Sequence, residues 1–113
     1  MFTASLQDVF TQEKIQKQNQ LNYQADLAMS FLVQDQTEAL KDNLTQAMTL
    51  SQIDFAILLT KNSAPFTIAR NGKVDLAENY EPTDGVQEYE TLLYRTIKVK
   101  DHSLTIGASH DKS

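Results

Sequence analysis

The 113-residue sequence contains no cysteine and no tryptophan, and it has only three glycines and two prolines. Without cysteine the chain cannot form disulfides, thiolate metal sites or a cysteine nucleophile. The serine motif G-x-S-x-G does not occur, and three glycines are too few for a phosphate-cradling loop. We therefore expect no enzymatic activity and no cofactor in this segment.

Long apolar runs and basic charge are scarce as well. No apolar run approaches the roughly 18 residues that a membrane helix needs, and the start of the chain does not resemble a signal peptide. The net charge of −5 disfavours a nucleic-acid binder, because such a protein needs a basic stripe to neutralise phosphates. It also disfavours a helix that lies flat on an anionic membrane.

The spacing of apolar residues changes near Ile53. The sequence before it is rich in glutamine, poor in turn formers and spaced like a helix, whereas short apolar runs broken by turn residues follow it. The length and the 41% apolar content are typical of one globular domain. We predict a single α+β domain over residues 1–113, with helices at about 5–51 packed on an antiparallel sheet of four to five strands at about 54–109.

The first predicted helix runs from Leu6 to about Val33 without glycine or proline. Its apolar residues form a weak early group and a stronger later one: Leu6, Val9 and Phe10, then Leu21, Ala25, Ala28 and Leu32. Such a helix is about 42 Å long, whereas a globule of this length has a radius of gyration of about 13 Å. The polar first half should therefore extend beyond the body, unless the helix is frayed or kinked near Lys17.

The second predicted helix begins after Asp35. A cap at Asp35 places Glu38 at the third helical position, which is the acidic variant of a capping box. One face of this helix is apolar and should be core: Leu40, Leu44, Ala47 and Met48. A turn this short predicts that the two helices pack antiparallel or at a steep angle.

Short strands and turns fill the second half. We predict strands at 54–60, 66–70 and 91–100 and a last strand carrying Leu104, Ile106 and Ala108, with turns at 61–65, 71–72 and 100–103. Residues 74–84 are acidic and irregular. Their carboxylates lack both calcium-loop spacing and an apolar shell, which favours a solvated acidic loop.

Arg95 has the same strand parity as Leu93 and Ile97, so it is predicted to face the core. An inward arginine needs a carboxylate partner from the protein or from a ligand. A pocket for a small carboxylate could combine Arg95 or Arg70 with nearby tyrosines, for which Tyr94 and Tyr80 are candidates. An internal salt bridge or an edge-strand position is the structural alternative.

The two histidines, His102 and His110, each neighbour an aspartate. A metal site needs three or four converging donors, which these pairs do not supply. We expect exposed polar residues and no metal site.

The whole layout resembles the extracytoplasmic PAS-like (Cache-like) sensor domains of bacterial histidine kinases and membrane-bound diguanylate cyclases. The residues that carry this resemblance are the first strand after the helical pair and the closing hairpin: Gln52 to Thr60, the turn near Asn62, Leu92 to Val99, and Ser103 to Ala108. No ligand-binding residue can be carried over from the family.

The resemblance implies a periplasmic sensing domain between two membrane helices that lie outside this chain. It also implies a homodimer through the first helix, for which the candidate contacts are Leu6, Val9, Phe10, Leu21, Ala25 and Ala28. The input would be a small molecule or a periplasmic protein, and the output would pass to a cytoplasmic domain. A small cytosolic α+β adaptor that binds other proteins remains the alternative, and an enzyme is a third reading.

Overall fold

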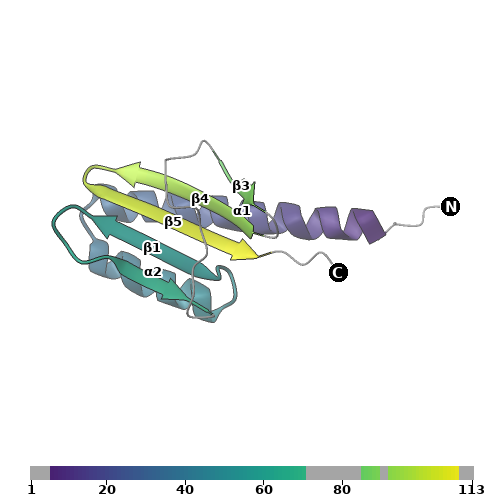
Figure 1. The fold of residues 1–113 in the computed structure, drawn as a ribbon, viewed down its shortest axis with the longest axis horizontal. Coiled ribbons are helices and arrows are strands. Elements are labelled where there is room, and N and C mark those ends of the chain that lie inside the picture. The colour runs from purple at the N-terminus through teal and green to yellow at the C-terminus, as the bar shows by residue number, and fades with distance from the viewer. Residues whose placement is uncertain (1–5, 71–84, 90–91, 110–113) are drawn as a thin grey trace.

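The computed structural model describes residues 6–70, 85–89 and 92–109, with the backbone alone at 6–11 and 89 (Figure 1). The elements of these residues, in chain order, are α1 (Leu6–Val33), α2 (Thr37–Thr49), β1 (Phe55–Thr60), β2 (Phe66–Ala69), β3 (Gln87–Tyr89), β4 (Leu92–Val99) and β5 (His102–Ser109). Both helices pack on one face of the sheet and run in opposite directions. The predicted α+β fold is confirmed.

The five strands form one antiparallel sheet in the order β2-β1-β5-β4-β3. The last strand, β5, therefore lies between β1 and β4, and the first and last strands of the chain are neighbours. β1 and β5 pair from Phe55 with Gly107 to Thr60 with His102. Since each strand is buried on at least part of both faces, this pair is the centre of the sheet.

The core lies between the helices and one face of the sheet. The register places Ala56 opposite Ile106 and Leu58 opposite Leu104, so these four side chains share the face toward the helices. The helices contribute apolar side chains that are at most 2% exposed: Leu21, Ala25, Ala28, Leu32, Leu40, Leu44 and Ala47. The predicted apolar faces of both helices are therefore the faces that pack on the sheet.

α1 is one continuous helix of 28 residues, so the alternative of a kink at Lys17 is not adopted. Its first half extends past the end of the sheet (Figure 1), and the molecule measures 58 × 26 × 25 Å. The described side chains of this half are largely polar. The apolar side chain of Ile15 is an exception, and it is 47% exposed.

The burial of α1 corrects part of the predicted dimer interface. Leu21, Ala25 and Ala28 are 0%, 1% and 0% exposed, because they pack inside this single chain. They offer no surface to a second copy. The side chains of the other candidates, Leu6, Val9 and Phe10, lie outside the described residues.

The capping prediction for α2 is wrong. Gln36 occupies the N-cap and makes no side-chain cap hydrogen bond. Asp35 instead adopts a left-handed conformation with φ of 57° and lies 3.4 Å from the ammonium of Lys100. The carboxylate of Asp35 therefore joins the α1–α2 connection to the turn between β4 and β5.

The strands differ little from the predicted ranges. β1 begins at Phe55, and β2 ends at Ala69, while β3 is a short edge strand that the apolar pattern did not locate. The predicted turn at 71–72 and the acidic stretch at 74–84 lie outside the described residues.

Candidate functional site

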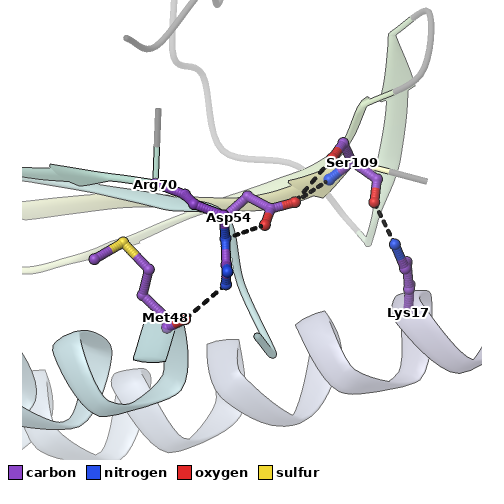
Figure 2. A network of polar contacts seen from close by, with 5 residues as sticks. All are labelled: Lys17, Met48, Asp54, Arg70 and Ser109. Atoms are coloured by element: carbon purple, nitrogen blue, oxygen red, sulfur yellow. Dashed lines mark hydrogen bonds and ion pairs between the residues drawn. The ribbon is translucent and has the colours of Figure 1, made fainter. Parts of the chain in front are cut away.

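A network of polar contacts around Asp54 joins the ends of several elements (Figure 2). Asp54 precedes β1, Arg70 follows β2, Ser109 ends β5, Met48 lies in the last turn of α2, and Lys17 belongs to α1. Two backbone hydrogen bonds fix the position of Asp54. The N–H of Asp54 donates to a carbonyl of β5 at 2.8 Å, and the carbonyl of Asp54 accepts from the N–H of Arg70 at 2.8 Å.

The side chains complete this network. One carboxylate oxygen of Asp54 accepts a hydrogen bond from Arg70 Nε at 3.1 Å. The other oxygen accepts from the backbone N–H of Ser109 at 2.7 Å and from its Oγ at 2.9 Å. Arg70 Nη2 donates to the carbonyl of Met48 at 2.7 Å, and Lys17 Nζ donates to the carbonyl of Ser109.

The network connects the ends of the two central strands to both helices. Asp54 and Arg70 side chains are 30% and 42% exposed, so solvent weakens their attraction. The carboxylate is nevertheless held by three donors from Arg70 and Ser109, and charge-assisted hydrogen bonds of this kind are directional. Moving the end of β5 relative to α1 would break the Lys17–Ser109 contact and strain the bonds between Ser109 and Asp54.

Arg95 faces the helices, as its strand parity predicts. Its Nη1 donates to Asn22 Oδ1 at 2.8 Å and lies 3.9 Å from Asp26 Oδ1, and the side chain is 17% exposed. Its Nε has no hydrogen-bond partner among the described residues. The protein itself therefore supplies the partners of this inward arginine, as the salt-bridge alternative proposes.

The candidate carboxylate-binding residues are not brought together. Tyr94 pairs with Gly107 and so faces away from the helices, opposite to Arg95. Arg70 belongs to the Asp54 network at the sheet end, and Tyr80 lies outside the described residues. Among the described residues, Arg70, Tyr94 and Arg95 therefore do not line a common pocket.

A pocket of about 200 Å³ lies at the other end of the sheet. The end of β1 and the start of β5 contribute to it, whereas the Asp54 network lies at the start of β1 and the end of β5. The lining comes from the start of α2, from β1 and β2 with their connecting turn, and from β5: Thr37, Glu38, Lys41, Leu58, Thr60, Ser63, Ala64, Phe66 and His102.

Two oppositely charged residues, Lys41 and Glu38, line this pocket. The Nζ of Lys41 lies 3.3 Å from Glu38 Oε1 and 5.5 Å from the centre of the Phe66 ring. The Glu38 side chain is 86% exposed, so the ion pair is open to water and stabilises the fold by about 0–1 kcal/mol. Lys41 is 34% exposed and packs its stem against the protein.

His102 lies in the same pocket, and its Nδ1 is 2.9 Å from Thr60 Oγ1. The β1–β5 register places these two residues directly opposite each other. His110 lies outside the described residues. Within the described ranges, no group of three or more His, Asp or Glu side chains is placed to hold a metal ion.

Comparison with protein-family models, with curated proteins and with solved structures finds no match to this chain. Neither helix of the described residues combines the length and apolar character that crossing a bilayer requires.

The sequence did not predict either of these two sites. Asp54 and Ser109 are 55 positions apart and meet only through the β1–β5 register. The pocket likewise combines α2 with both central strands. A charged residue directly before an apolar strand was the only local signal for Asp54, and Lys41 gave no local signal.

Proposed function

We propose that this chain is the extracytoplasmic sensing domain of a membrane-bound bacterial signalling receptor and that it performs no chemistry itself. The observation that carries this proposal is the link between the two ends of the domain. The start of α1 and the end of β5 point toward the same end of the molecule (Figure 1), and Lys17, near the middle of α1, binds the helix to β5 by donating to the carbonyl of Ser109.

The Asp54 network explains how a signal would leave the domain. Ser109 is bound to Asp54 and to Lys17, and Arg70 extends the connection from Asp54 to the end of α2. Packed elements have discrete arrangements, and a ligand that binds one arrangement better shifts the equilibrium between them. A shift of β5 against α1 would then reach the flanking membrane helices.

The pocket, which lies at the opposite end of the sheet from the Asp54 network, supports the same proposal. β5 begins in the pocket at His102 and ends in the network at Ser109, and β1 connects the same two places from Thr60 to Asp54. The two central strands therefore provide a direct connection between a binding site and the proposed exit to the membrane.

The location of the domain tests this proposal. In the full-length gene product, we expect apolar spans of about 20 residues on both sides of this segment. A phosphatase reporter that is active only outside the cytoplasm, fused within the full-length protein after Ser109, should show activity. A cytoplasmic result would overturn the proposal and favour the adaptor function.

A second experiment tests the output path. The domain is placed between the membrane helices of a histidine kinase whose transcriptional output can be measured. Asp54→Asn should change the basal output several-fold, because it weakens the hold on Ser109 and Arg70. Asp42→Asn, an equal charge change at an exposed site of α2, should leave the output unchanged. Equal outputs for both variants would contradict the proposed path.

A further inference from the structure

We infer that the pocket between the start of α2 and the β1–β2 turn binds a small oxyanion, a carboxylate or a phosphate group, on the ammonium of Lys41. This inference rests on the proposed function, because it names the chemical class of the input. It places the site away from Arg95, whose partners come from α1.

Lys41 is the anchor because its charge is poorly compensated. Its carboxylate neighbour, Glu38, is 86% exposed and 3.3 Å away, so the pair is weak and water-screened. The ammonium itself lies over the Phe66 ring, in a pocket with the buried Leu58 side chain in its wall. An oxyanion that enters this pocket meets the charge where fewer water molecules screen it.

Other residues that line the pocket carry hydrogen-bond donors. Thr37 and Ser63 each bring a hydroxyl group, and no side-chain hydrogen bond of either is found among the described residues. The Nδ1 of His102 shares a hydrogen bond with Thr60 Oγ1. When Thr60 is the donor, the ring proton lies on Nε2, which can then donate to a ligand. Carboxylate and phosphate oxygens accept several such bonds at once, so this set of groups matches an oxyanion.

The size of the pocket limits the ligand. Its volume of about 200 Å³ lies below the range of about 300–1,000 Å³ that is usual for drug-sized ligands. A small organic acid or a free phosphate fits this space, and a large or polymeric ligand would have to remain mostly outside.

Glu38 is the competitor of the ligand in this arrangement. It also lines the pocket and pairs with Lys41 across one turn of α2. Removing its charge should therefore strengthen binding, whereas removing the charge of Lys41 should weaken it. Two variants with opposite expected signs distinguish a specific site from general attraction to a protein of net charge −5.

The test is a titration of the ¹⁵N-labelled 113-residue chain with succinate and, separately, with inorganic phosphate at constant pH and ionic strength. Amide signals of Ser63 and His102 should shift and saturate with at least one probe. Lys41→Gln should raise the dissociation constant about tenfold, equivalent to about 1.4 kcal/mol. Lys98→Gln, the same charge loss at an exposed site on the other face of the sheet, should change it by less than about twofold.

Glu38→Gln should lower the dissociation constant for the same probe. If Lys41→Gln fails to fold, the direction of this change tests whether the oxyanion binds at Lys41. Saturation by succinate alone assigns a carboxylate ligand, and saturation by phosphate alone assigns a phosphate ligand. Saturation by both identifies a general oxyanion site. No saturating shift with either probe, or shifts unchanged by both pocket variants, would overturn the inference. The reporter experiment tests the sensing role independently, so the two can fail separately.

Discussion

At the scale of single residues, Gly107 shows how closely the centre of the sheet is packed. Gly107 is paired with Phe55 on one side and with Tyr94 on the other. A Cβ atom at this position would lie 2.2 Å from an atom of the Phe55 ring and 2.9 Å from the carbonyl oxygen of Leu93. The ring could move, but the backbone oxygen belongs to a hydrogen-bonded strand.

We therefore predict that Gly107→Ala lowers the free energy of unfolding by about 1–3 kcal/mol, the usual cost of overpacking. Gly85→Ala is the matched control, because nothing lies within 4 Å of a Cβ atom added at Gly85. Its effect should stay within about 0.5 kcal/mol. Urea unfolding of both variants measures the difference, and equal stabilities would contradict the packing argument.

Arg95 provides a second prediction at this scale. Asn22→Ala should lower the free energy of unfolding by about 1–3 kcal/mol, because it removes the acceptor at 2.8 Å from a cation that is 17% exposed. Asp26→Ala should cost less than about 0.5 kcal/mol, since that carboxylate is 75% exposed and 3.9 Å away. Urea unfolding of the two variants measures both losses of stability. A larger loss for Asp26→Ala would mean that the carboxylate is the true partner.

At the scale of elements, α2 begins without the side-chain cap that most helices have. The N-cap residue is Gln36, whose side chain makes no bond to the first turn. Gln36→Ser should raise the free energy of unfolding by about 0.5–1 kcal/mol, because a serine hydroxyl can accept from a free N–H of that turn.

Gln46→Ser is the control for this prediction. It makes the same substitution at an exposed position beyond the first turn of α2, where serine is less favourable than glutamine by a few tenths of a kcal/mol. The two substitutions should shift the thermal midpoint in opposite directions. Shifts of the same sign would show that a side-chain cap at position 36 does not stabilise α2.

The elements that could be predicted are those with strong periodicity. The range of α1 follows from a stretch without glycine or proline whose second half carries a helical apolar stripe, and β1 follows from a short apolar run. β3 was not located, because its three residues, Gln87 to Tyr89, are an edge strand without an apolar pattern. The cap of α2 was mistaken, because Asp35 can adopt the left-handed conformation and bind Lys100 instead of the helix.

The sites could not be predicted because they depend on register. Local patterns indicate which residues form strands, but they do not indicate that the last strand pairs with the first. The parity of Arg95 did predict its direction correctly, because strand parity is a local property. Its partners on α1 could not be named from the sequence, since they lie 73 positions away.

At the scale of the whole molecule, the projecting half of α1 is the surface on which we place a second copy. The described residues there are mostly exposed, and Ile15 is an apolar side chain among them. We predict that the chain forms dimers at high micromolar concentration and that Ile15→Lys raises the dimer dissociation constant without lowering the thermal midpoint.

Leu21→Ala is the contrasting variant. Because Leu21 is fully buried within one chain, this change should lower the free energy of unfolding by about 2–5 kcal/mol. Sedimentation measures the dimer constant, and calorimetry measures the thermal midpoint. A wild-type chain that sediments as a monomer at high micromolar concentration would contradict the dimer prediction.

The position of β5 at the centre of the sheet also has a consequence for synthesis on the ribosome. Four consecutive residues of β1, from Phe55 to Leu58, are buried in the finished fold. Their partner strand, His102–Ser109, follows about 40 residues later and leaves the ribosome after β1 and β2. Until it emerges, one edge of β1 has no partner and its apolar side chains remain open to other chains. The central β1–β5 pair can therefore form only after β5 has left the ribosome.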